Sequence, residues 1–183
     1  MVKKRILVTG GAGYVGTALL PKLLEAGHEV TVFDNLMQGG NQLLSFFRNK
    51  NFHFVNGDVT IKKDVEAAVK DKDIIIHLAA IVGFPACKNN PNIIETTTPE
   101  QVILYGSTGS NYGKVTDVCT EESPLNPLSL YGETKTEAEH MLMDRGNVIA
   151  YRFATAFGVS PRLRLDLLIN DFTNKCLRDG YLV

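Results

Sequence analysis

Short runs of apolar, often β-branched residues alternate along the chain with segments in which apolar residues recur every three or four positions. The first pattern is typical of buried strands and the second of amphipathic helices. A regular alternation of the two favours a parallel sheet, because each parallel strand needs a long crossover, usually a helix, to reach the next. The pattern therefore predicts an α/β protein built on a doubly wound parallel sheet.

The predicted strands cover residues 5–9, 29–33, 52–56, 73–77, 101–105 and 147–153, and the predicted helices cover residues 13–26, 63–70 and 130–144. The first helix presents its leucines on one face and is followed by Gly27, a residue typical of helix ends. The run DIIIH at 73–77 is continuously apolar, which indicates a strand buried on both faces. In contrast, PNIIETTTPE at 91–100 is a poor helix, and we expect an extended linker there that exposes one face of the sheet.

Composition narrows the class of protein further. The 183 residues are 44% apolar and 21% charged, which fits one globular domain with a sizeable core. A net charge of -1 with scattered Lys and Arg gives no electrostatic reason to expect nucleic acid or a membrane surface as a partner. The apolar stretch at the start ends at Thr9, which argues against a signal peptide. Three cysteines without a CxxC pair favour a reduced, cytoplasmic setting and no metal site.

The stretch GGAGYVG at residues 10–16 lies between the first predicted strand and the first predicted helix. A tight turn needs a residue without Cβ, the approach of a pyrophosphate to the backbone needs another, and the helix N-terminus favours phosphate. Asp34 ends the second strand, where its carboxylate can accept hydrogen bonds from a ribose diol and repel a 2′-phosphate. These residues predict a dinucleotide site that selects NAD over NADP.

Six segments occur in an order that resembles the extended short-chain dehydrogenase/reductases of the NAD-dependent sugar-nucleotide epimerase/dehydratase family. They are TGGAGYVG, VFDNL, GDVT, HLAA, GSTGSNYG and YGETK, and they span essentially the whole chain. The resemblance implies a Rossmann-like fold, NAD as cofactor and a nucleotide-sugar as substrate. It also implies cofactor contacts from Gly10, Gly13, Tyr14, Val15, Asp34, Asn35, Asp58, Val59, Leu78, Ala79, Ala80, Tyr131 and Lys135.

Tyr131 and Lys135 stand four residues apart on a predicted helix, so their side chains project from the same face. A phenol with a pKa of about 10 is a poor base, but a nearby ammonium and a positive nicotinamide both favour the phenolate. Tyr131 would then take the proton of a substrate hydroxyl as hydride passes to the nicotinamide, and Lys135 would also hold the nicotinamide ribose. The resemblance implies that Thr108 holds the reacting oxygen, with Ser107 as the alternative.

The residues after Thr108 bear on the type of reaction. Similar 4,6-dehydratases carry an Asp-Glu pair at the two following positions, which are Gly109 and Ser110 here. Similar decarboxylases generally keep an acidic residue in this loop. Both reactions are therefore disfavoured, and 4-epimerisation through a transient keto-sugar is favoured, since it needs no further acid or base. The alternatives are a keto-sugar nucleotide reductase and a non-catalytic NAD-binding remnant.

We expect an NAD-binding domain at residues 1–160 and the start of a substrate-binding region at 161–183, with most of the family's C-terminal substrate domain missing. Arg162 suits a substrate diphosphate, with a solvated surface arginine as the alternative. Val82 and Thr108 are expected to line the sugar pocket, whereas His77 is expected to be a packed, neutral histidine. Relatives use the long helix of the crossover at 91–100 in a homodimer interface, so its shortness here argues against that homodimer.

Overall fold

The computed structural model describes residues 2–80 and 92–181. Its strands are β1 (Arg5–Thr9), β2 (Glu29–Asp34), β3 (Phe52–Asn56), β4 (Ile74–His77), β5 (Val102–Thr108) and β6 (Val148–Phe153). Its α-helices are α1 (Tyr14–Glu25), α2 (Lys62–Val69), α3 (Asn92–Thr96), α4 (Leu130–Met143) and α5 (Leu168–Asp179). Two 3₁₀ helices, η1 (Asn41–Arg48) and η2 (Gly109–Tyr112), follow β2 and β5 along the chain.

The six strands form one parallel sheet in the order β3-β2-β1-β4-β5-β6, which confirms the predicted fold class. The order reverses between β1 and β4. At such a switch point the connections leaving the two strands diverge to opposite sides and open a crevice at the carboxyl edge. Thr9 at the end of β1 pairs with Phe33 of β2 and His77 of β4, so the three central strands end level at this crevice.

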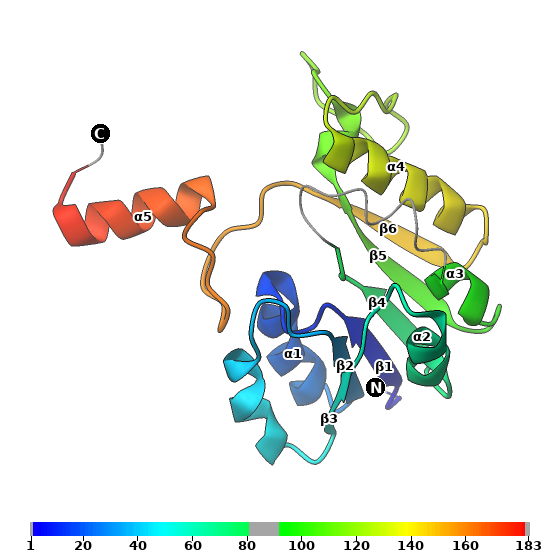
Figure 1. Cartoon of the computed structure of the whole chain (residues 1–183). Helices are drawn as coiled ribbons and strands as arrows, with labels where there is room; N and C mark the ends of the chain where they lie inside the picture. The colour runs from blue at the N-terminus through cyan, green and yellow to red at the C-terminus, as the bar shows by residue number, and fades with distance from the viewer. Residues whose placement is uncertain (1, 81–91, 182–183) are drawn as a thin grey trace.

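Helices cover both faces of the central strands (Figure 1). On one face α2, α3 and α4 pack on a core that contains Leu7, Phe33, Val65, Ile75, Ile93, Ile103 and Leu142. On the other face α1 and η1 pack on a core that contains Ile6, Val8, Leu20, Val30, Val32, Leu43 and Ile76. Successive residues of β1 thus enter opposite cores, which explains why that strand is apolar without a break.

The crossover between β4 and β5 differs from the expected extended linker. Asn92–Thr96 forms the short helix α3, whose Ile93 is 2% exposed. Tertiary contacts stabilise it: Arg145, just beyond α4, donates hydrogen bonds to the carbonyl oxygens of Ile94 (2.6 Å) and Thr97 (2.6 Å). The prediction that this face of the sheet is exposed is therefore wrong around the central strands, which α3 helps to cover. Helix α3 would be weak in isolation, but Arg145 bonds carbonyl oxygens near its end.

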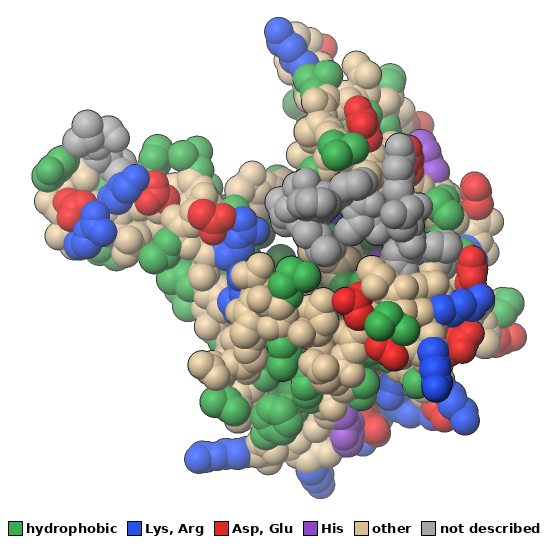
Figure 2. Space-filling view, in the orientation of Figure 1, with side chains coloured by type: hydrophobic (Ala, Val, Ile, Leu, Met, Phe, Trp, Pro, Cys, Tyr) green, Lys and Arg blue, Asp and Glu red, His purple; other side chains and the backbone are tan. Residues whose placement is uncertain are grey.

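The last two elements leave apolar surface exposed. On the α1 side of edge strand β6, the stacked Tyr151 and Phe153 are each almost half exposed. Helix α5 projects away from the sheet (Figure 1) and carries exposed apolar side chains such as Leu168 and Phe172. In the view of Figure 2, Lys and Arg are dispersed among acidic and apolar side chains rather than gathered in one patch. Within residues 2–80 and 92–181, no helix is long and apolar enough to cross a membrane.

Candidate cofactor and active site

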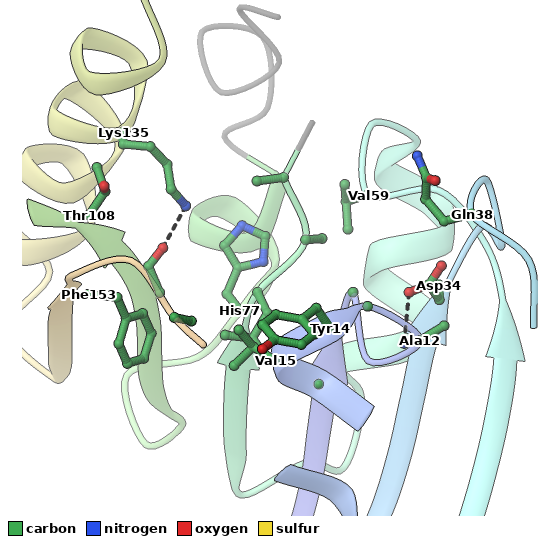
Figure 3. A pocket seen from close by; sticks show the side chains of 18 of the residues that line it. Ala12, Tyr14, Val15, Asp34, Gln38, Val59, His77, Thr108, Lys135 and Phe153 are labelled. Atoms are coloured by element: carbon green, nitrogen blue, oxygen red, sulfur yellow. Dashed lines mark hydrogen bonds between the residues drawn. The ribbon is translucent and has the colours of Figure 1, made fainter. Parts of the chain in front are cut away.

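A cleft of 1280 Å³ opens at the carboxyl edge of the sheet, between the β1–α1 turn, α4 and the segment that follows β6 (Figure 3). It brings together almost all the residues that the sequence singled out. Lining it are Gly10, Gly13, Tyr14, Val15, Asp34, Asn35, Asp58, Val59, Leu78, Ala79, Ala80, Thr108, Tyr131, Lys135 and Arg162. Val82, the remaining predicted contact, lies outside the described residues.

Glycine is required in the β1–α1 turn for a different physical reason at each position. Gly10 adopts a φ of +68°, and a Cβ there would lie 2.7 Å from the backbone nitrogen of Ala79, after β4. At Gly16 a Cβ would lie 2.6 Å from the Cα of Gly11, so this glycine lets α1 pack against its own turn. Gly13 is the N-cap of α1 and makes no side-chain capping bond. The first amides of α1 thus lack a side-chain cap at the cleft, an arrangement that fits a pyrophosphate.

Asp34 is fixed beside this turn by two backbone hydrogen bonds. Its Oδ2 accepts from the nitrogen of Ala12 (3.0 Å) and its Oδ1 from the nitrogen of Leu36 (2.9 Å). Gln42 braces the same turn from η1 by donating to the carbonyl oxygen of Ala12 (2.7 Å). Each carboxylate oxygen can accept a further bond, so the group can receive a ribose diol at the end of β2.

Asp58 and Asn35 lie at the same end of the cleft as Asp34, where Asn35 donates to Asp58 Oδ2 (3.1 Å). The backbone nitrogen and hydroxyl of Thr60 donate to Asp58 Oδ1 at 2.8 and 2.7 Å. These hydrogen bonds hold the pKa of Asp58 below its usual value. The carboxylate is therefore a charged acceptor, and it is ordered before any ligand arrives.

His77 forms part of the cleft wall at the end of β4 (Figure 3). Its Nδ1 lies 2.7 Å from the hydroxyl of Thr9, and its ring stacks on Tyr105. Burial and the nearby Lys135 ammonium lower the pKa of His77 to about 3. The expected packed, neutral histidine agrees with this geometry, and Thr9 is the hydrogen-bond partner that could not be identified from the sequence.

Lys135 lies in the middle of α4 and is only 3% exposed. Its Nζ donates to the carbonyl oxygen of Gly106 on β5 (2.6 Å) and lies 4.5 Å from the ring centre of Tyr105. Tyr131 is one turn earlier on the same helix, near the N-terminus that Ser129 caps by accepting from the nitrogen of Gly132 (3.1 Å). Both side chains line the cleft, as their spacing predicts.

Thr108 is the last residue of β5 and lines the cleft opposite α1. Its Oγ1 accepts from the nitrogen of Ser110 (3.2 Å), which leaves the hydroxyl hydrogen as a donor. Ser107, in contrast, donates its hydroxyl hydrogen to Glu139 on α4 (2.5 Å). Because the Ser107 hydroxyl hydrogen is already bonded to Glu139, Thr108 is the better candidate to donate a hydrogen bond to a substrate oxygen.

Sequence reasoning missed the way in which the segment after β6 is bound to α1. The Tyr14 hydroxyl donates to the carbonyl oxygen of Gly158 (2.6 Å) and accepts from the side-chain amide of Asn170 (3.0 Å). Ser160, 6% exposed, lies 2.8 Å from the Thr17 hydroxyl and donates to the carbonyl oxygen of Tyr14 (2.7 Å). No local pattern announces these bonds, because they join residues far apart in the sequence.

Gln38 and Phe153 also line the cleft, together with Arg162. Arg162 donates to the side-chain oxygen of Gln38 (2.9 Å), so the segment after β6 meets the loop after β2. Phe153, at the end of β6, faces the cleft near Thr108 (Figure 3). Neither Gln38 nor Phe153 was predicted; for Phe153 the available signal was its position at the carboxyl end of a parallel strand, where ligands bind.

One cleft brings together a glycine turn at the switch point, a carboxylate at the end of the next strand, and a Tyr and a Lys one helical turn apart. This arrangement is typical of α/β proteins that bind a nucleotide cofactor. Residues 6–179 match the family described as "NAD dependent epimerase/dehydratase family". The chain belongs to this NAD-dependent family.

Individual relatives differ in the reaction they are named for. UDP-glucuronic acid decarboxylase 1 of Danio rerio is 31% identical over 202 aligned positions, which cover 99% of this chain and 45% of the relative. UDP-arabinose 4-epimerase 1 of Arabidopsis thaliana is 30% identical over 188 positions, which cover 87% of this chain and 45% of the relative. The chain thus spans about half the length of these curated relatives.

Among solved structures, dTDP-glucose 4,6-dehydratase from Bacillus anthracis in complex with NAD superposes with a TM-score of 0.86 at 27% identity. The superposition covers 96% of this chain and 62% of that structure. Epimerases, dehydratases and decarboxylases all resemble the chain to a similar degree, so overall similarity identifies the family and leaves the type of reaction to the residues of the cleft.

Proposed function

We propose that the chain binds NAD and carries the site of a nucleotide-sugar 4-epimerase. The observation that supports this most directly is that Thr108, Tyr131 and Lys135 line the same cleft as Asp34 and the glycine turn. The uncapped start of α1 fits the pyrophosphate, and the ordered Asp34 carboxylate fits the ribose diol. That carboxylate would repel a 2′-phosphate, so NAD is expected to bind more tightly than NADP.

The residues around the reacting carbon would divide the chemistry between them. When bound, NAD supplies a reversible hydride acceptor. Tyr131 as phenolate takes the proton of the sugar hydroxyl while the Thr108 hydroxyl donates a hydrogen bond to the same oxygen. Lys135 would favour the phenolate through its positive charge and would hold the nicotinamide ribose. After the keto-sugar turns over, Tyr131 would return the proton to the oxygen, and hydride would come from the reduced cofactor to the opposite face of the carbon.

The turn after Thr108 separates this proposal from the reactions of other family members. Gly109 and Ser110 carry no carboxylate, and Ser110 uses its backbone nitrogen to bond Thr108. Elimination of water from a sugar requires a proton to be removed from carbon and another to be given to the leaving hydroxyl. This turn offers no carboxylate for either transfer, so the proposal favours epimerisation over dehydration. Keto-sugar reduction would use the same three residues and is the second candidate.

The substrate region is proposed on narrower grounds. Arg162 reaches the rim of the cleft and offers a guanidinium that suits a diphosphate, although its present partner is Gln38. The division into an NAD-binding domain at 1–160 and a substrate region from 161 stays a prediction. A non-catalytic NAD-binding module is the third candidate, because the chain spans about half of its curated relatives.

A titration with NADH tests the first step. The chain has no Trp, so the fluorescence of the bound cofactor can be followed directly, with NADPH as competitor. Saturable binding that NADPH displaces poorly is the expected result, and no binding would refute the proposal. Incubation with UDP-sugars would then detect interconversion of 4-epimers, which separates epimerisation from reduction because only reduction consumes NADH. Cofactor binding without turnover of any UDP-sugar would favour the non-catalytic module.

A further inference from the structure

On the same face of α4 as Tyr131 and Lys135 lies a buried carboxylate that the proposed chemistry does not use. Glu139 is one turn beyond Lys135 and two turns beyond Tyr131, so all three share one stripe of the helix. It is 3% exposed. A charge at that depth is costly unless several donors satisfy it, so its presence calls for a specific explanation.

Four donors from three other elements converge on this carboxylate. Oε1 accepts from Nε (2.9 Å) and Nη2 (2.6 Å) of Arg152 on β6. Oε2 accepts from the Ser107 hydroxyl on β5 (2.5 Å) and from the side-chain amide of Asn111 on η2 (3.0 Å). Burial alone would raise the pKa of Glu139, but the bonds from Arg152 and Ser107 outweigh it and lower the pKa. The group is therefore an anion that joins α4 to the two outer strands and to the turn.

The residues that bond Glu139 Oε2, Ser107 and Asn111, lie next to Thr108 or in the turn that follows it. Ser107 precedes Thr108 on β5, and Asn111 lies in the turn whose Ser110 nitrogen orients the Thr108 hydroxyl. Lys135 contacts the same strand one residue earlier, at the Gly106 carbonyl. Gly106, Ser107 and Thr108 thus bond in succession to Lys135, Glu139 and their own turn, so the register of α4 on β5 sets the position of Thr108 relative to Tyr131.

Arg152 is held on its other side as well. Its Nη1 donates to the Tyr112 hydroxyl (3.0 Å) and to the carbonyl oxygen of Glu121 (2.9 Å), and its guanidinium lies 5.1 Å from the centre of the Tyr112 ring. The network therefore continues from Glu139 through Arg152 to the far end of η2 and the loop beyond it. Both oxygens of the Glu139 carboxylate are bonded, and a buried carboxylate satisfied in this way favours one relative arrangement of the elements that it joins.

We propose that Glu139 is a positioning residue that holds the strand and turn of Thr108 in register with the Tyr131–Lys135 face of α4. The role rests on the proposed function for its purpose, but the positioning itself is a property of the fold. Displacing catalytic groups by about 1 Å can lower a rate on the order of 100-fold, so such a network can control activity from outside the cleft.

The test compares Glu139→Gln with a control, Val65→Ala, in a core residue of α2 that is 0% exposed and does not line the cleft. Glutamine keeps the size of the side chain, but its amide NH₂ must face either Arg152 or the donors from Ser107 and Asn111. Both variants are expected to lose stability. Measured where circular dichroism shows each to be folded, Glu139→Gln should weaken NADH binding at least tenfold, whereas Val65→Ala should change it less than twofold.

A second measurement does not depend on the cofactor. The chain is labelled with ring-¹³C tyrosine, and the Tyr131 signal is assigned by its loss in Tyr131→Phe. The chemical shift of this signal should change in Glu139→Gln and should match that of the unaltered chain in Val65→Ala. If the unaltered chain fails to bind NADH, the proposed function is refuted, while this comparison still decides the role of Glu139.

Two results would overturn the inference: NADH affinity equal in both variants, or a Tyr131 signal that Glu139→Gln leaves unmoved. Should Glu139→Gln not fold, Ser107→Ala replaces it, because it removes one donor and leaves the Glu139–Arg152 ion pair in place. Its expected effect is about a threefold loss of NADH affinity and a smaller displacement of the Tyr131 signal. An unchanged affinity and signal in Ser107→Ala would equally refute the positioning role.

Discussion

Replacing Gly10 by alanine tests whether the β1–α1 turn needs glycine at this position because of its close approach to Ala79, and Gly27 provides a matched control. Both residues have a positive φ, +68° at Gly10 and +84° at Gly27. A Cβ at Gly27 would meet no atom within 4 Å, whereas at Gly10 it would lie 2.7 Å from the backbone nitrogen of Ala79. Both variants therefore incur the left-handed backbone penalty, but only one also forces two backbone segments apart.

The magnitudes follow from these contacts. The backbone penalty for a non-glycine residue is about 1–2 kcal/mol and applies to both variants. An ordinary carbon contact is about 3.5–4.0 Å, so the alanine methyl at Gly10 would need about 1 Å of separation between the β1–α1 turn and the end of β4. Overpacking of this kind costs about 1–3 kcal/mol. We therefore expect Gly10→Ala to lose about 2–5 kcal/mol of unfolding free energy and Gly27→Ala about 1–2 kcal/mol.

Urea unfolding followed by far-ultraviolet circular dichroism measures both losses, and the NADH titration measures the effect on the site. Since the displaced segments both line the cleft, Gly10→Ala should also weaken NADH binding by more than tenfold, while Gly27→Ala should leave the affinity unchanged. Equal stability losses and equal NADH affinities in the two variants would show that the close approach at Ala79 is not what requires glycine at residue 10.

Three further outcomes are expected. Asp34→Ser removes the carboxylate that repels a 2′-phosphate, so the preference for NADH over NADPH should fall at least tenfold in the competition titration; an unchanged preference would contradict this assignment. Tyr131→Phe should retain NADH binding within about threefold but lower epimer interconversion by about 10²–10⁴-fold, and activity that survives would refute the proton-transfer role. The depressed pKa of His77, about 3 against an ordinary 6.5, means that the unfolded chain binds the extra proton first as the pH falls. Stability contributed by this histidine is therefore present above pH 6.5 and lost progressively down to pH 3, by at most about 2 kcal/mol at pH 5; His77→Gln should reduce the stability difference between pH 5 and pH 7 measured by urea unfolding, and an unchanged difference would contradict it.

The central strands and the glycine turn could be predicted because their signals are local. The apolar runs that form β1, β2 and β4 enter two cores at once, so their composition alone identifies them, and the bounds of β1 and β3 agree with the prediction. The turn residues and Asp34 are specified by backbone geometry and by position at a strand end. These requirements can be recognised in a single sequence because they involve neighbouring residues.

Other features could not be predicted because they depend on contacts between residues that are far apart in the sequence. Helix α3 forms where threonines and a proline predict none, because Arg145 bonds its carbonyl oxygens from the end of another helix. Strand β5 continues to Thr108, three residues beyond the predicted end, because Gly106, Ser107 and Thr108 pair with β6. Helix η1 was missed although its apolar side chains recur three and four positions apart. Glu139 looks like any polar helix position until its four donors are seen together.

The bonds between Tyr14 and the segment after β6 have a consequence for the dynamics of the chain. Tyr14 begins the helix at which the cofactor pyrophosphate is expected, and its hydroxyl joins Gly158 to Asn170. We therefore expect ligand binding at the start of α1 to be coupled to local opening of residues 158–170, and such a coupling acts equally in both directions. Amide hydrogen exchange in this segment should slow when NADH binds. Backbone amides more than 140 residues from Tyr14 in the sequence would then report on cofactor binding.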